Sequence, residues 1–332
     1  MPTNARVTDP NALPLRELYQ YLAATGLVRR LLELARDEDL GPVESPWKGQ
    51  GRVAAAEVFA GDITTAVCTA PHQKGRASLV ARAGGVIAGL AAMNDLLAVF
   101  APGSLFTGAV NDGESVPAGT VLGTLAGPLD EVLELERTLL NLVSRLSGVA
   151  TRTHSFVQAV GGGTQARVYD TRKTTPGLRV LEKYAVRCGG GCCHRLGLYD
   201  AVLIKDNHLA GVRVSELAVF VAGAASKARQ LSTHPLSFVE VEADTLEQFD
   251  ALLTLPRGTI DIVLLDNMGM EDLARASAQR DRLAPWLELE ASGGVTLESV
   301  GGIARTGVNR ISVGALTHSV SSLDLALDVV VR

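Results

Sequence analysis

The chain has 332 residues and a formal net charge of −5, and 47% of its residues are hydrophobic while only 4% are aromatic. This length predicts two domains, or one barrel with an added domain. The acidic balance argues against nucleic acid as the main partner, and no apolar run approaches the roughly 18 residues of a membrane span. An interior of Ala, Val, Leu and Ile, with 34 glycines, favours α/β architecture over an aromatic-rich β-sandwich.

The first ten residues are polar and lack the apolar core of a secretory signal, so we expect a cytoplasmic protein. The four cysteines form no disulfide framework for a chain of this length and are expected to be reduced thiols: Cys68, Cys188, Cys192 and Cys193. A zinc site that includes His194 is disfavoured, because the spacing lacks a second CxxC pair.

The first half of the chain alternates helix and short strands. Leucines at spacings of three and four predict helix over 14–40, and a Gly- and Pro-rich loop over 41–51 ends this pattern. Short strands with glycine turns are predicted next, over 77–81, 85–87 and 120–125. Helix is predicted again over 130–160.

From residue 165 the chain reads as strand, loop and helix in repetition, which implies a parallel sheet. The predicted strands cover 166–169, 201–204, 237–241, 260–265, 287–290 and 310–313. Each strand is followed by polar or glycine residues, and (β/α) barrel enzymes place their chemistry at that rim. An open doubly wound sheet collects ligands only near its switch point. Because every strand contributes here, the pattern favours a barrel.

Segments 170–179, 189–195 and 205–208 concentrate Arg, Lys and His beside glycines and strand ends. Arg presents a planar fork to carboxylate or phosphate, and Lys presents a compact charge. The alternative is a solvated basic surface. Because the charges do not follow a helix face and the chain is acidic, the cluster predicts a site for an anionic small molecule.

Two loops between strand and helix predict a phosphate site. Ser292-Gly293-Gly294 and the segment 314–319 offer backbone N–H groups at a helix start, where an anion is favoured. Either loop alone is compatible with an ordinary βα turn. Two in succession at the end of a barrel-like series stand at the expected phosphate position.

Glu242 and Asp266 end neighbouring predicted strands, so their carboxylates are expected to face one cavity. They suit sugar hydroxyls, or Mg²⁺ held between them and substrate phosphates. The alternative is that each acid is an N-cap or part of a surface pair. For Glu242 this structural interpretation is about as well supported as the ligand-binding one. Asp266 is better placed, because it ends an apolar run where an unpaired charge is costly.

Two further basic residues leave alternatives open. Lys205 ends an apolar strand and suits a Schiff base, as in barrel aldolases, but its Arg and His neighbours favour anion binding. Arg137 lies in the middle of a predicted helix, where the default is a solvated face or a pair with Glu134.

The chain resembles the quinolinate phosphoribosyltransferase family from about residue 38 onward. The resemblance is carried by motifs in the same order at 61–65, 136–141, 146–151, 170–179, 182–186, 194–195, 203–208, 265–268, 290–295 and 314–319. It implies an α/β fold with an N-terminal α/β sandwich domain over 1–145, to which 320–332 returns. An open-sided, incomplete α/β barrel of the type II phosphoribosyltransferase kind then covers 146–319. It also implies a homodimer in which one subunit's sandwich domain closes over the other's barrel.

The resemblance implies transfer of phosphoribosyl from 5-phosphoribosyl pyrophosphate to quinolinate with decarboxylation, in NAD biosynthesis, with Mg²⁺ as cofactor. Arg137 then reaches the neighbouring subunit's site, and Lys173 serves the pyrophosphate. Carried over motif by motif, the dicarboxylate pocket comprises Arg172, His194, Arg195 and Lys205, with Thr171 beside it. The acids facing ribose and Mg²⁺ are Glu242 and Asp266, and the 5′-phosphate cradle comprises Ser292, Gly293, Gly294, Gly314 and His318. The alternatives are a molybdenum-transport-associated relative, a non-catalytic sensor and a Schiff-base aldolase.

Two departures from the family pattern stand out. Residues 41–60 are an insertion between motifs that usually lie almost side by side. Cys193 replaces the Asn that normally precedes the His-Arg pair, which removes an amide from the surroundings of His194.

Overall fold

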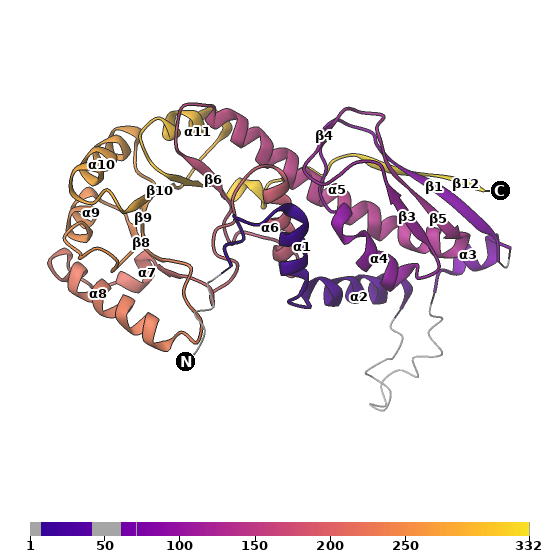
Figure 1. Ribbon diagram of the computed structural model, residues 1–332, viewed down its shortest axis with the longest axis horizontal. Helices are drawn as coiled ribbons and strands as arrows, with labels where there is room; N and C mark the ends of the chain where they lie inside the picture. The colour runs from indigo at the N-terminus through magenta and orange to yellow at the C-terminus, as the bar shows by residue number, and fades with distance from the viewer. Residues whose placement is uncertain (1–7, 42–60, 71, 332) are drawn as a thin grey trace. The chain divides into compact units, whose positions relative to one another are not determined.

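The computed structural model describes residues 8–41, 61–70 and 72–331 (Figure 1). The insertion therefore lies largely outside the described residues. The chain forms two compact units. The barrel unit comprises Met1–Leu13, Arg152–Thr175 and Gly190–Ser319, and the sandwich unit comprises Pro14–Thr151, Pro176–Gly189 and Val320–Arg332. This division falls inside the long helix α5 (Leu129–Val160), whereas the boundary predicted after residue 145 stays a prediction.

The sandwich unit contains a four-stranded sheet in the order β12-β1-β5-β3. Its strands are β12 (Leu325–Val331), β1 (Lys74–Ala81), β5 (Val121–Pro128) and β3 (Leu105–Gly108), and each pairing is antiparallel. In the centre, Leu79 pairs with Leu327 on one side and Gly123 on the other. A small antiparallel sheet joins β2 (Gly85–Val86) to β4 (Ser115–Val116). The last strand thus returns to the first sheet.

Among the described residues, six helices belong wholly to the sandwich unit: α1 (Leu15–Ala23), α2 (Leu27–Leu40), α3 (Ile63–Cys68), the 3₁₀ helix η1 (Leu90–Ala92), α4 (Met93–Phe100) and α6 (Arg179–Cys188). The helix predicted over 14–40 is two helices, because Gly26 adopts φ 75°, a left-handed conformation that ends a helix. Asp62 caps α3, and its Oδ1 accepts from Thr65 N at 3.0 Å.

The barrel unit has a parallel sheet in the order β6-β11-β10-β9-β8-β7. The strands are β6 (Arg167–Tyr169), β7 (Val202–Ile204), β8 (Val239–Ala243), β9 (Ile262–Asp266), β10 (Glu288–Ser292) and β11 (Arg310–Ser312). All six predicted strands are present. β6 and β7 are the two edges and do not pair with each other in this sheet, so the barrel is open, and the expected fold class is confirmed.

Helices follow the strands of this sheet: α7 (Asp206–Leu209), α8 (Val214–Leu231), α9 (Leu246–Leu252), α10 (Met270–Leu283), α11 (Leu297–Ala304) and the 3₁₀ helix η2 (Gly314–Leu316). Figure 1 shows α8 to α11 around the outside of the strands. Across the described residues, the helices are too short or too polar to span a membrane.

Helix α5 approaches the returning C-terminal segment closely at Gly148, where a Cβ would lie 2.3 Å from the backbone oxygen of Ser321. Gly148→Ala is expected to destabilise the protein by about 1–3 kcal/mol, because backbone must move to relieve the overlap. Gly223→Ala in α8 is the matched control: its Cβ meets nothing within 4 Å, so a gain of about 0.5–1 kcal/mol is expected. Urea unfolding measures both, and equal effects would contradict the close approach.

Candidate active site

The carboxyl ends of the barrel strands surround a cavity of about 730 Å³. All the predicted site residues except Arg137 and Glu242 line it: Thr171, Arg172, Lys173, His194, Arg195, Lys205, Asp266, Ser292, Gly293, Gly294, Gly314 and His318. Ten of them lie at or just after the ends of five strands, and His194 and Arg195 lie in the loop before β7, so the fold brings together what the sequence separates. One cavity therefore holds both the predicted dicarboxylate residues and the predicted phosphate loops.

Arg172 and Arg195 supply positive charge on one part of this cavity. Burial lowers the pKa of Arg195, and the nearby Arg172 guanidinium lowers it further. The buried Nε of Arg172 has no hydrogen-bond partner among the described residues. An anion that accepts hydrogen bonds from both guanidinium groups would offset their mutual repulsion, and it can also pair with the buried Nε of Arg172.

Lys205 faces the cavity from the end of β7. Its Nζ lies 2.7 Å from Oε2 of Glu242 in β8, a carboxylate that is almost fully buried. Its backbone N–H donates to Nδ1 of His208 at 2.9 Å, and His208 N donates back to its carbonyl at 2.8 Å. The Lys-Asp-Asn-His motif is thus one short helical turn that fixes Lys205 beside Glu242.

Glu242, Asp244 and Asp266 form an acidic group at the ends of β8 and β9. One ligand atom from each lies within 4.8 Å of the others. Burial raises the pKa of Asp244, and the charges of Asp266 and Asp206 raise it further. The prediction included Glu242 and Asp266 but not Asp244, although its position two residues after Glu242 was a usable signal. Carboxylate oxygens are the donors that suit Mg²⁺.

The first glycine loop has no room for a side chain at Gly293. Gly293 adopts φ 96°, and a Cβ there would lie 2.0 Å from Oδ1 of Asn267. Asn267 itself has φ 54°, its N–H donates to Ser292 O at 2.9 Å, and its Nδ2 donates to Oδ2 of Asp266 at 2.6 Å. Asn267 therefore links the loop to the acidic group. Sequence reasoning did not assign it a role.

The second loop packs against the Lys173 side chain. A Cβ on Gly314 would lie 2.9 Å from Cδ of Lys173 and 3.2 Å from the His318 ring. Thr317 Oγ1 donates to the Lys173 carbonyl at 2.6 Å, and Lys173 N donates to Thr171 Oγ1 at 3.0 Å. Lys173 is thereby held between the end of β6 and the loop after β11.

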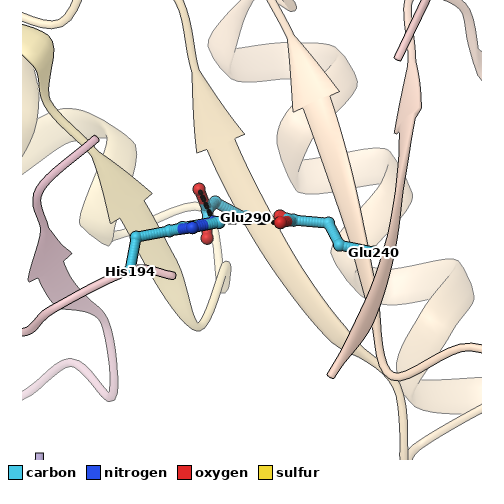
Figure 2. Close-up of side chains that lie close together, drawn as sticks. All are labelled: His194, Glu240 and Glu290. Atoms are coloured by element: carbon cyan, nitrogen blue, oxygen red, sulfur yellow. Dashed lines mark ion pairs between the residues drawn. The ribbon is translucent and has the colours of Figure 1, made fainter. Parts of the chain in front are cut away.

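His194 belongs to a buried polar group with Glu240, Glu290 and Arg310; Figure 2 shows its ring directed at both carboxylates. His194 Nε2 lies 2.9 Å from Glu240 and 3.4 Å from Glu290, and Arg310 Nε lies 2.7 Å from Glu290. The Arg310 guanidinium also stacks on the Tyr169 ring at 3.8 Å. Glu240, Glu290 and Arg310 were not predicted; the signal was their charge inside otherwise apolar strands.

The charges of this group are compensated internally. Burial lowers the pKa of His194, but the carboxylates of Glu290 and Glu240 outweigh it and raise this pKa to about 9. Burial raises the pKa of Glu240, and the neighbouring Glu290 raises it further. His194 Nδ1 accepts from Arg195 N–H at 2.8 Å, so both ring nitrogens have protein partners. Its contact with a substrate carboxylate stays a prediction.

Arg137 lies in α5 within the sandwich unit. It lines a separate pocket of about 500 Å³ with Asn141, Ser144 and residues 322–325. Its predicted role in a neighbouring subunit's site stays a prediction. All four cysteines are free thiols, and the described clusters with metal-ligand geometry contain no cysteine.

Known proteins resemble this chain along most of its length. The family model for the quinolinate phosphoribosyl transferase C-terminal domain matches residues 149–328, and the model for the N-terminal domain matches 62–147. A nicotinate-nucleotide pyrophosphorylase [carboxylating] of Mycobacterium leprae is 43% identical over 272 residues, which cover 81% of this chain and 91% of that protein. A quinolinate phosphoribosyltransferase [decarboxylating] of Nicotiana tabacum is 36% identical over 300 residues, covering 85% and 82%.

The fold comparison agrees. The solved structure of the nicotinate-nucleotide pyrophosphorylase from Francisella tularensis superposes with a TM-score of 0.74 at 32% identity, and the match covers 97% of this chain and 99% of that one. The two family models, the order of the motifs and the open barrel all indicate the same family. The chain belongs to the quinolinate phosphoribosyl transferase family.

Proposed function

We propose that this protein transfers the phosphoribosyl group of 5-phosphoribosyl pyrophosphate to the ring nitrogen of quinolinate, and that nicotinate mononucleotide, CO₂ and pyrophosphate are formed. This is a step of NAD biosynthesis. The observation that carries the proposal is one cavity with two guanidinium groups and two glycine loops in its wall. A pyridine diacid and a sugar polyphosphate together match that distribution of charge.

The dicarboxylate end of the site uses Arg172, Arg195 and Lys205. Two arginines present forks to the carboxylates, and the ammonium of Lys205 adds a third positive charge. His194 lies directly beside them, at the margin of the buried group. Arg137 of a second subunit completes the pocket in this proposal.

The phosphoribosyl end uses the glycine loops and the acids. Backbone N–H groups of Gly293, Gly294 and Gly314, with Ser292 and His318, cradle the 5′-phosphate. Glu242 and Asp266 accept hydrogen bonds from the ribose hydroxyls, and Lys173 faces the pyrophosphate. The close packing around Gly293 and Gly314 supports this assignment, because it leaves backbone rather than side chains at the loop surface.

Mg²⁺ fits the oxygen donors of Glu242, Asp244 and Asp266. When bound, the ion supplies positive charge that neutralises the substrate's phosphate oxygens. Glu242 is already paired with Lys205, so in this proposal the acids hold the ion largely through water and substrate.

Catalysis in this proposal rests on position and charge. As the bond from ribose C1 to pyrophosphate breaks and the bond to the pyridine nitrogen forms, Glu242 and Asp266 stabilise positive charge on the ribose, and Lys173 stabilises the departing anion. The alkylated nitrogen then attracts the electron pair left when the adjacent carboxylate departs as CO₂. A proton from water replaces that carboxylate on the ring.

The Schiff-base alternative is not favoured. A Schiff-base lysine attacks as a free amine, whereas the Nζ of Lys205 is engaged by Oε2 of Glu242 at 2.7 Å. A molybdenum-transport-associated relative is not favoured either, since the named relatives act on quinolinate or carry the carboxylating pyrophosphorylase name.

We also propose that the protein works as a cytoplasmic homodimer with sites shared between subunits. The free thiols support the compartment. Arg137 does not line the cavity of the barrel unit but a pocket of the sandwich unit. This separation is consistent with a role for Arg137 in the cavity of a second subunit.

The proposed reaction predicts CO₂ release that requires quinolinate, 5-phosphoribosyl pyrophosphate and Mg²⁺ together. EDTA should abolish the release, and excess Mg²⁺ should restore it. Measurement uses carboxyl-labelled quinolinate with chromatography of the nucleotide formed. Nicotinate is the matched control base, because it lacks the carboxylate that leaves, and it should yield little nucleotide. Absence of release with all three components present would contradict the proposal.

The shared site predicts complementation between two inactive subunits. Arg137→Ala should raise the quinolinate KM steeply, and Lys205→Ala should inactivate its own cavity. Co-expressed with different tags, the two chains should form mixed dimers with one intact site, and a random mixture should recover about a quarter of wild-type activity. A mixture that stays as inactive as its parents rules out sharing.

A further inference from the structure

The loop that carries His194 and Arg195 has an unusual set of hydrogen bonds. Cys192 pairs with the backbone of β6, because its N–H donates to Val168 O at 2.8 Å. From Cys193 to Gly197, every backbone N–H donates to a side chain instead. The acceptors, in order, are Asn11 Oδ1, Asp170 Oδ1, His194 Nδ1, Asp200 Oδ2 and Asp200 Oδ1, at 2.7–2.8 Å.

Among these acceptors, Asn11 comes from far away in the sequence. Asp200 and His194 belong to the loop itself, and Asp170 ends the neighbouring strand. Asn11 precedes Cys193 by 182 positions. It is held in place by Asp9, whose Oδ1 accepts from Asn11 N–H at 2.8 Å. The side chain of Asn11 thus ties the N-terminal segment to the site.

Asn11 makes two bonds to the same residue. Its Oδ1 accepts from Cys193 N at 2.7 Å, and its Nδ2 donates to Cys193 O at 3.0 Å. A planar amide offers both functions side by side, whereas a carboxylate offers acceptors alone. The pair therefore fixes both the position and the orientation of the peptide groups that flank Cys193. Cys193 itself is 3% exposed, so an unmet N–H or carbonyl here is costly.

The residues that follow this clamp are those of the dicarboxylate pocket. His194 and Arg195 are the next two residues, and both are nearly buried. A shift of the Cys193 peptide moves both side chains together, and displacement of about 1 Å is enough to weaken a positioned contact. Arg195 also has to stay in place against the repulsion of Arg172.

We propose that Asn11 is a positioning residue for quinolinate binding: its amide clamps Cys193 and thereby aims Arg195 and His194 into the cavity. The inference rests on the proposed function for the identity of the ligand. It assigns to the N-terminal segment, which precedes both family-model matches, a part in the site.

Asn11→Ala and Asn11→Asp test the proposal. The alanine variant removes both bonds, and the aspartate variant keeps the size and the acceptor but sets a carboxylate against Cys193 O. Both should raise the quinolinate KM about tenfold, which corresponds to about 1.4 kcal/mol, while the KM for 5-phosphoribosyl pyrophosphate changes less than twofold. If Asn11→Ala does not fold, Asn11→Asp carries the same test.

Asn111→Ala is the matched control, since its amide donates to Glu114 in an exposed turn of the sandwich unit. It should leave both KM values unchanged. Equal changes in both KM values for the Asn11 variants, or no change, would overturn the proposal.

Hydrogen exchange of the 192–198 peptide, followed by mass spectrometry, separates this inference from the proposed function. Exchange should be faster in Asn11→Ala than in wild type, and it does not depend on turnover. Inactive wild-type protein would contradict the proposed function, whereas unchanged exchange in Asn11→Ala would contradict the clamp.

Discussion

The repulsion between the guanidinium groups of Arg172 and Arg195, which both line the cavity, is the constraint that the site has to meet. Burial and this neighbour together lower the pKa of Arg195, so the two like charges act on each other. They are held in place by backbone. Arg172 follows β6, and Arg195 lies in a loop whose N–H groups donate one by one to side chains. A bound dianion relieves the repulsion, and little reorganisation is then needed.

Negative charge beneath the cavity complements this arrangement. Glu240 and Glu242 are two positions apart on β8 and therefore point to the same face of the strand. Glu240 is fully buried against His194, whereas Glu242 reaches Lys205 at the cavity. Arg310 and His194 balance the buried carboxylates, because an uncompensated charge in this interior is costly. One strand thus contacts two residues of the cavity wall from behind, His194 through Glu240 and Lys205 through Glu242.

The sequence was sufficient to predict the six parallel strands, because each has a local hydrophobic pattern. It was also sufficient to predict the residues of the cavity that follow these strands, because the carboxyl ends of parallel strands meet at one edge of the sheet. It was insufficient where distant segments meet. The clamp by Asn11, the packing of Asn267 over Gly293 and the pairing of β12 with β1 depend on tertiary contacts that no local pattern encodes. The break at Gly26 was missed because the leucine spacing continues through it.

Strand β12 pairs with β1 at the edge of the sandwich sheet, yet all six strands of the barrel unit lie between them in the sequence. During synthesis, β1 therefore leaves the ribosome long before its partner exists. The backbone N–H and C=O groups of β1 that later pair with β12 therefore remain unpaired while the barrel strands are synthesised. Such separation slows folding and leaves an unpaired edge exposed to other nascent chains. Strands β1, β5 and β3 can pair early, but completion of the sandwich sheet by β12 is a late event, because β12 is the last strand to be synthesised.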